Sequence, residues 1–507
     1  MTSAIQLDGS SLTLENLAAI AHDFAAVAIA DSARARVRAS RSLVDDFARR
    51  DEPTYGINTG FGNFAEVRIP ADSLSDLQVN LLRSHAAGVG DSLPVPVVRA
   101  TMALRANVLA KGFSGIRMET LELLVELLNR RVHPVVPSRG SVGASGDLAP
   151  LAHLALVLIG EGEAWRGHQT EPGAEALRHA GLTPAALAAK EGLALINGTQ
   201  PSTALLGLTA GHGERLARAA DIAAAMSIDA LHGSTRPFDA RIHSARGFAG
   251  QQMSAANLMA LMSGSPINAS HANCGRVQDA YSMRCTPQVH GAAREALAFA
   301  RQVFQTEANA ATDNPMVFHD SGEIVSGGNF HGAPVAIASD VLCLALTQLA
   351  TISERRCERL VNPALSGLPA FLTRHGGLES GLMMAQVTAA ALTSELKTLA
   401  HPASVDSIPT SGNREDHVSM SMAAGLKAAR AAELARDVIA CELLCACEAI
   451  DLLQPLVSSA TLMRVHDFIR SRVPIFEHDR PLSPDLRTIS NTIVSGELER
   501  ACALKVN

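Results

Sequence analysis

The chain has 507 residues, of which 47% are hydrophobic but only 3% aromatic, and its formal net charge is −7 at pH 7. This length exceeds that of one ordinary compact core, and an interior built from Ala, Leu, Val and Met favours helices over sheets. No block of Lys and Arg could follow a phosphate backbone, which argues against nucleic acid as the main partner. Small molecules remain as the expected partners.

The N-terminus, MTSAIQLDGSSLTLENLAAIAHDF, has no basic region followed by an apolar run, and no later segment offers ~18 uninterrupted apolar residues for a membrane span. We therefore expect a soluble, cytoplasmic protein without a membrane partner. The eight cysteines lie inside helical patterns, so we expect no disulfides. Cys441, Cys445 and Cys447 lack an accompanying histidine, which predicts small buried side chains there rather than a metal site.

Up to about residue 204, short helical patterns alternate with loops rich in Gly, Pro and Ser. The rest of the chain contains long Ala/Leu-rich stretches, at residues 340–361, 381–399 and 418–456, with apolar residues at spacings of three and four. We predict a mainly α fold, with a mixed, loop-rich N-terminal lobe over residues 1–204 and an elongated helical bundle with C-terminal helices over residues 205–507.

Polar loops that carry glycine interrupt these helical patterns: YGINTGFG at 55–62, INGT at 196–199, VQDAYSMRC at 277–285, SGGNF at 326–330 and SGNREDHVSM at 411–420. Loops with unusual side chains on a rigid scaffold are where binding and catalysis concentrate. The chain's two tyrosines, Tyr55 and Tyr281, both lie in such loops. Both are therefore candidate proton-transfer groups, and the alternative is a structural tyrosine at the edge of a core.

The stretch GSVGASGDLAPLAH, residues 140–153, places three glycines around Ser145 directly before an apolar segment. Familiar nucleophile motifs do not fit it, because Asp147 stands where Gly-x-Ser-x-Gly needs its second glycine. One interpretation is a helix cap, in which Ser145 or Asp147 accepts N–H groups of a helix that begins near Leu148. A cap accounts for the aspartate but leaves the glycines unexplained.

A second interpretation uses every residue of this turn. If the turn is compressed, the nitrogen of Gly146, which no Cβ hinders, can attack the carbonyl carbon of Ala144 and close a five-membered ring. Loss of water from the ring and from the Ser145 side chain leaves an exocyclic methylene, an electrophile that no ordinary side chain offers. The N-terminus of the following helix would stabilise negative charge that develops on the ring.

GSVGASGDLAPLAH resembles the stretch that forms the 4-methylideneimidazole-5-one (MIO) group in aromatic amino-acid ammonia-lyases and aminomutases. The resemblance extends from Tyr55 to about Met420 through segments in the family's order: YGINTGFG, LLRSHAAGVG, INGT, VQDAYSMRC, NAATDNP, SGGNFHG and HPASVDSIPTSGNREDHVSM. It implies an MIO group made from the chain itself, without an external cofactor or a metal. It also implies a homotetramer whose active sites combine residues of several subunits.

The resemblance implies a role for each matching residue. Ala144, Ser145 and Gly146 would become the electrophile to which the substrate's amine adds, and Tyr55 would be the base that removes a β-proton. Arg284 would bind the substrate's carboxylate with its planar fork, with Tyr281 beside it.

Two amides and one aromatic ring complete the implied site. Asn197 and Gln278 would orient the substrate or the MIO oxygen, and Phe330 would pack near the ring. For each amide, a hydrogen bond that only stabilises its loop is an equally simple alternative.

His85 and Glu415 resemble the residues that face the substrate's ring in the histidine branch of the family, since a carboxylate suits an imidazole. The alternatives are a capping His85 and a solvated Glu415, and Arg414 stands where that branch usually has Gln. The expected reaction is therefore elimination of ammonia from L-histidine to give trans-urocanate. A phenylalanine or tyrosine ammonia-lyase and an aminomutase remain as alternatives within the family, and a non-catalytic helical scaffold remains as one outside it.

Overall fold

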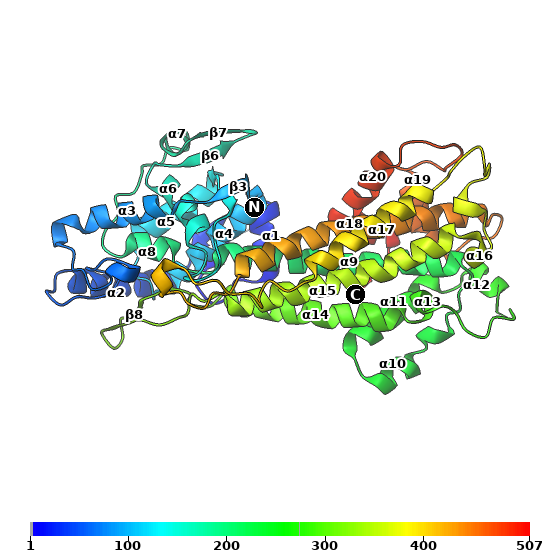
Figure 1. Ribbon diagram of the computed structural model, residues 1–507, viewed down its shortest axis with the longest axis horizontal. Helices are drawn as coiled ribbons and strands as arrows, with labels where there is room; N and C mark the ends of the chain where they lie inside the picture. Colours follow the sequence, from blue (N-terminus) through cyan, green and yellow to red (C-terminus); the bar gives the residue numbers. More distant parts are fainter. Residues whose placement is uncertain (1–3, 273, 507) are drawn as a thin grey trace. The chain divides into compact units, whose positions relative to one another are not determined.

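The computed structural model describes residues 4–272 and 274–506, which form two compact units (Figure 1). The first unit contains the described residues up to Leu208 together with Ala300–Asp340 and Pro402–Leu426. The second contains Thr209–Phe299, Val341–His401 and the described residues from Lys427 onward. Each unit is therefore built from three separate segments of the chain. The predicted boundary between an N-terminal lobe and a helical bundle, at residues 204 and 205, stays a prediction.

The first unit is built from short helices and small sheets. Its elements are β1 (Ile5–Leu7), α1 (Leu14–His22), β2 (Val27–Ile29), α2 (Asp31–Ala48), α3 (Leu74–His85), β3 (Val89–Ser92), α4 (Val95–Ala110), α5 (Met118–Asn129), β4 (His133–Pro134), β5 (Pro137–Arg139), α6 (Leu148–Leu158), β6 (Glu163–Arg166), β7 (Gln169–Pro172), α7 (Gly173–His179), α8 (Glu191–Ile196), β8 (Met316–Phe318) and β9 (Glu323–Val325). β1 and β2 pair in parallel, whereas β3–β5, β4–β6–β7 and β8–β9 are antiparallel. Helices α3, α6 and α8 pack against one another.

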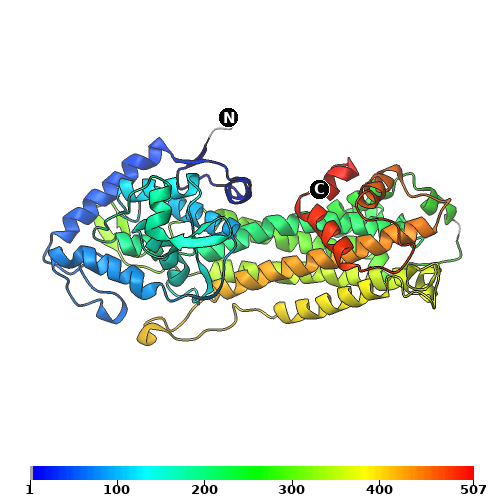
Figure 2. The same ribbon diagram turned by 90° about the horizontal axis from the view of Figure 1, so that it is seen from above.

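Each of four long helices has one part in the first unit and the other part in the second. They are α9 (Gln200–Ala230), α14 (Thr286–Glu307), α15 (Ala333–Val361) and α18 (Ser421–Leu452). Within the second unit these helices lie side by side in both views (Figures 1 and 2). Its shorter helices are α10 (Ala240–Arg246), α11 (Ala249–Met262), α12 (Pro266–Ser270), α13 (Tyr281–Arg284), α16 (Pro363–Ser366), α17 (Met383–Leu399), α19 (Ala460–Arg470), α20 (Ser483–Val494) and α21 (Glu497–Cys502). The predicted mainly α fold is confirmed.

Alanine explains how the long helices pack so closely. On α9, Ala220, Ala223 and Ala224 are fully buried, because alanine combines the highest helix propensity with a side chain short enough to let a neighbouring helix approach. Helix α15 is long and apolar enough to cross a membrane by composition, but 72% of its most apolar window is buried inside the fold. The eight cysteines form no disulfide within the described residues, and the predicted burial of Cys441, Cys445 and Cys447 is confirmed.

A buried ion pair joins the long helices of the second unit. The guanidinium of Arg356 on α15 contacts the carboxylate of Glu442 on α18, with Nη2 donating to Oε2 at 2.9 Å, and neither side chain is exposed. Ser227 on α9 donates to Glu442 Oε1 at 2.7 Å. Arg356 Nη1 also donates to the carbonyl of Ser282 at 3.3 Å, so the same pair holds α13 in place.

We expect Glu442→Leu to lower the free energy of unfolding by about 3–5 kcal/mol, because it leaves the Arg356 charge buried without its partner. The double variant Arg356→Met/Glu442→Leu should recover much of this loss. Urea denaturation measures both effects, with Glu395→Leu as the control, since Glu395 and Arg430 form a half-exposed pair 3.2 Å apart. Equal losses for Glu442→Leu and Glu395→Leu would contradict the expectation.

Candidate active site

The turn at residues 140–147 is compressed against its neighbours. Gly143 and Gly146 have φ angles of +67° and +71°, in the left-handed region that disfavours side chains. A Cβ at Gly146 would lie 2.3 Å from the carbonyl oxygen of Gly198, and one at Gly143 would lie 2.2 Å from Ser419 Oγ. Glycine is therefore required at both positions by conformation and by space.

Asp147 anchors the turn from inside the fold. It occupies the N-cap position of α6, but its fully buried carboxylate makes no capping hydrogen bond to that helix. Instead, Oδ1 accepts a hydrogen bond from Ser141 Oγ at 2.7 Å, and Oδ2 accepts one from the Ser202 N–H at 2.9 Å. The interpretation of Asp147 as a side-chain helix cap is therefore wrong, because both carboxylate oxygens are already bound to residues outside α6.

Asn197, at the C-terminal end of α8, reaches the turn directly. Its Nδ2 donates to the carbonyl oxygen of Ser145 at 3.0 Å, and the backbone N–H of Asp147 donates to the Gly198 carbonyl at 2.8 Å. Asn197 Oδ1 is buried and has no hydrogen-bond partner among the described residues. The asparagine amide thus points one donor at the Ser145 carbonyl and leaves one acceptor for another molecule.

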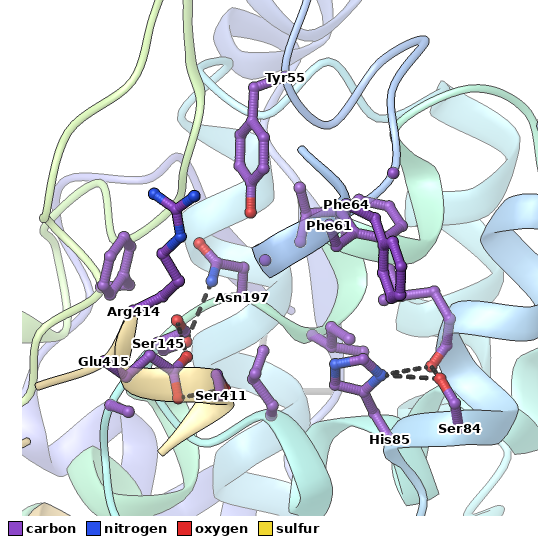
Figure 3. Close-up of a pocket in the computed structure, with 18 of the residues that line it drawn as sticks. Tyr55, Phe61, Phe64, Ser84, His85, Ser145, Asn197, Ser411, Arg414 and Glu415 are labelled. Carbon is purple, nitrogen blue, oxygen red and sulfur yellow. Dashed lines mark hydrogen bonds between the residues drawn. The ribbon is translucent and has the colours of Figure 1, made fainter. Parts of the chain in front are cut away.

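A cavity of about 950 Å³ in the first unit opens over this turn. Its wall combines the loop that follows Tyr55, the end of α3, the turn itself, the end of α8 and the segment around Glu415 (Figure 3). The predicted site residues that line it are Tyr55, His85, Ala144, Ser145, Asn197, Phe330 and Glu415, while Gly146 is buried and does not line the cavity.

The Tyr55 side chain points its hydroxyl into the cavity, toward Asn197 (Figure 3). Burial raises the pKa of Tyr55 above its ordinary value, the Gly62 N–H opposes this shift, and the charge of Glu415 adds to it. The surroundings within this unit therefore favour the neutral phenol. A base role for Tyr55 needs positive charge from another source.

His85 has a defined hydrogen-bond pattern. Its Nδ1 lies 2.9 Å from the Leu81 carbonyl oxygen, which can only accept, so Nδ1 carries the proton. Burial lowers the pKa of His85, against the hydrogen bond to Leu81 and the charge of Glu415, which both favour the imidazolium. In the resulting neutral ring Nε2 is an acceptor, and this nitrogen is turned toward the cavity (Figure 3).

Glu415 is held by three hydroxyl donors. Ser145 Oγ donates to Oε1 at 2.7 Å, and Thr410 Oγ1 and Ser411 Oγ donate to Oε2 at 2.6 and 2.7 Å. Burial opposes ionisation, but these hydrogen bonds outweigh it and lower the pKa of Glu415 below its usual range. The cavity therefore presents a carboxylate beside a neutral histidine.

Three predicted site residues belong to the second unit and do not line this cavity: Gln278, Tyr281 and Arg284. Tyr281 is 70% exposed, and the guanidinium carbon of Arg284 lies 4.6 Å from the centre of its ring. Arg284 Nε is buried without a hydrogen-bond partner among the residues that the structure describes. Helix α13 thus presents a stacked tyrosine–arginine pair.

Several residues of this site were not predicted from the sequence. Phe61 and Phe64 line the cavity, and Phe61 could have been identified because it lies within YGINTGFG in a chain poor in aromatic residues. Arg105, fully buried in the apolar helix α4, donates to the carbonyl of Asn197 at 2.9 Å. The signal for Arg105 was an arginine inside the largely apolar sequence MALRANVLA, in which Asn107 is the other polar residue.

We expect Gly146→Ala to destabilise the protein more than Gly167→Ala, which is a matched control. Gly167 has a φ of +63° in the β6–β7 turn, but a Cβ there meets nothing within 4 Å. Both variants strain the backbone by ~1–2 kcal/mol, and the overlap with Gly198 adds about 1–3 kcal/mol at Gly146 alone. Urea denaturation measures the difference, and equal losses would show that the contact with Gly198 relaxes freely.

Comparisons with known proteins agree with this geometry. The sequence model of the family described as aromatic amino acid lyase matches residues 12–471. Histidine ammonia-lyase of Anaeromyxobacter sp. (strain K) is 58% identical, over 97% of this chain and 99% of that protein. The crystal structure of histidine ammonia-lyase from Trypanosoma cruzi has a TM-score of 0.92 and 44% identity, covering 99% of this chain and 95% of that one. Tyrosine aminomutase from Streptomyces globisporus has a TM-score of 0.95 and 37% identity, with complete coverage of both chains. The chain belongs to the aromatic amino acid lyase family.

Proposed function

We propose that this enzyme, a carbon–nitrogen lyase, eliminates ammonia from L-histidine to give trans-urocanate. The observation that carries the proposal is a single cavity that holds Ser145, His85 and Glu415 together. The similarity to histidine ammonia-lyases over nearly the whole chain supports the same substrate. We place the protein in the cytoplasm, with a small-molecule substrate and no nucleic-acid or membrane partner.

The residues of the turn fit the formation of an MIO group from Ala144, Ser145 and Gly146. Attack of the Gly146 nitrogen on the Ala144 carbonyl carbon, followed by dehydration, releases one water, and loss of the Ser145 hydroxyl with its α-proton releases a second. The MIO group supplies an electrophilic methylidene carbon that accepts the substrate's amine. Asn197 Nδ2 donates to the oxygen of Ser145, where this chemistry accumulates negative charge.

His85 and Glu415 account for the choice of an imidazole ring. His85 Nε2 and the Glu415 carboxylate are both acceptors, so a ring with N–H groups satisfies them, whereas a phenyl ring leaves them desolvated without a donor. Maturation strengthens this preference. It removes the Ser145 hydroxyl, and with it the donor to Glu415 Oε1.

Tyr55 is the proposed base for the β-proton. This role requires further positive charge in the complete site, because burial within the first unit raises the pKa of Tyr55 and favours the neutral phenol. We propose that the protein is a homotetramer and that a neighbouring subunit supplies Gln278, Tyr281 and Arg284. Arg284 would bind the substrate's carboxylate. Exposed apolar side chains on helices of the second unit support this assembly, among them Phe299 at 41%, Leu344 at 45% and Val387 at 44%.

An aminomutase uses the same groups and returns the ammonia to the β-carbon. The similarity to tyrosine aminomutase from Streptomyces globisporus keeps this outcome as the second candidate. His85 and Glu415 favour histidine over tyrosine as the substrate, and the products distinguish the two reactions.

Mass spectrometry tests the electrophile. The intact chain should be lighter than its sequence mass by about two waters, roughly 36 Da. Ser145→Ala should not show the full loss of two waters, because it has no Ser145 hydroxyl to lose. Ser145→Ala should also lose nearly all activity while its thermal unfolding midpoint and assembly stay unchanged, because the turn remains. An active wild-type chain of full mass would contradict the proposal.

A panel of aromatic amino acids tests the substrate. We expect kcat/KM for ammonia release to be ~10³-fold higher for L-histidine than for L-phenylalanine or L-tyrosine, because a ring without an N–H leaves the buried carboxylate unpaired. Glu415→Gln should narrow this difference. A higher kcat/KM for cinnamate formation than for urocanate formation would overturn the histidine assignment and leave the lyase assignment intact.

A further inference from the structure

Arg105 is a fully buried cation behind the candidate active site, in a run of apolar residues on α4. Its guanidinium has three acceptors at the C-terminal end of α8 and just beyond. Nε donates to the carbonyl of Ala194 at 3.0 Å, and Nη1 donates to the carbonyl of Asn197 at 2.9 Å and to Gln200 Oε1 at 2.8 Å. Nη2 also donates to the Ala194 carbonyl. Of the three residues that provide these acceptors, only Asn197 lines the cavity.

The physical chemistry of this contact explains why an arginine is tolerated there. Burying a cation is costly, but the last carbonyls of a helix carry partial negative charge and lack partners within the helix. Burial lowers the pKa of Arg105 to about 10, and the charge of Asp313 opposes this shift. The guanidinium therefore remains charged at neutral pH and fixes the end of α8 through a planar, multidentate contact.

The backbone of Gly198 lies between the Arg105 guanidinium and the turn at Gly146. A Cβ at Gly198 would lie 2.4 Å from Arg105 Nη1, and a Cβ at Gly146 would lie 2.3 Å from the Gly198 carbonyl oxygen. The guanidinium, the backbone of Gly198 and the turn at Gly146 are thus stacked with no side chain between them. Any movement of Arg105 would release the surface against which residues 144–146 are pressed.

We propose that Arg105 is a positioning residue for the maturation and the chemistry of this site. It fixes the backbone of residues 197–198, so that Asn197 Nδ2 meets the Ser145 oxygen and the turn stays compact enough for Gly146 to approach the Ala144 carbonyl. The inference rests on the proposed function, because it assumes that the turn cyclises. Arg105 itself touches neither the substrate nor the reacting atoms.

Arg99 provides a matched control on the same helix. It is 1% exposed, and it donates to the carbonyls of Ile20 at 2.8 Å and Leu128 at 3.0 Å, neither of which lines the cavity. Burial lowers its pKa to about 10, as it does for Arg105. Removing either guanidinium therefore costs a comparable buried network, but only Arg105 contacts residues of the site.

The experiment compares Arg105→Lys, Arg105→Met and Arg99→Met by intact mass and steady-state kinetics with L-histidine. For both Arg105 variants we expect fewer than half of the chains to show the ~36 Da deficit. We also expect about 10²-fold lower kcat per matured chain with little change in KM, as for a misplacement of about 1 Å. Arg99→Met should show a similar fall in thermal unfolding midpoint but the full deficit and an unchanged kcat.

Each outcome decides between the alternatives. Complete maturation and near wild-type kcat in Arg105→Lys would overturn the inference while leaving the proposed function intact. The same maturation defect in Arg99→Met would also overturn it, because the effect would then follow from lost stability alone. A wild-type chain of full mass would instead refute the proposed function. If Arg105→Met does not fold, Arg105→Lys decides, because lysine keeps the charge and the apolar stem but not the fork.

Discussion

The close contact between Gly146 and Gly198 is the constraint on which the rest of the site depends. Two backbone segments, far apart in sequence, meet at a distance that no side chain would permit. Their contact puts the Ser145 carbonyl within reach of Asn197 and brings the N-terminus of α6 under the turn. The glycines around Ser145 are therefore a condition for assembling the site, and the chemistry of the serine follows from that geometry.

The two units hold their short polar segments in place by different arrangements of buried charged and polar groups. In the first unit, buried polar groups such as Asp147 and Arg105 hold loop backbones that have no regular hydrogen-bond ladder of their own. In the second unit, alanine-rich helices pack closely and enclose the Arg356–Glu442 pair, which secures α13 through Ser282. In both arrangements, burying a charged group is unfavourable by itself, but its hydrogen bonds fix a short polar segment in one defined position.

Much of the candidate site could be predicted from local sequence, because Tyr55, Ser145 and Glu415 lie in unusual polar segments that resemble family motifs. His85, at the end of α3, could be predicted from the resemblance alone. The long helices were equally predictable from their alanine and leucine spacing. The role of Arg105 could not be predicted, because the sequence of a largely apolar helix does not show which residues an arginine within it contacts. The return of Ala300–Asp340 and Pro402–Leu426 to the first unit was also hidden, because no local preference encodes contacts across hundreds of residues. The proposed place of Gln278 and Arg284 in the site rests on an assembly of several subunits, which one chain does not contain.

The hydrogen bond from Ser145 Oγ to Glu415 Oε1 has a consequence for timing. If the turn cyclises as proposed, the serine hydroxyl of the precursor occupies the acceptor that a substrate ring would use, and the precursor would block its own specificity pocket. The proposed loss of this hydroxyl as water would remove the competing donor, while Thr410 and Ser411 keep the carboxylate in place. Under this proposal, the chain would become able to recognise its substrate in the same step in which it becomes able to transform it.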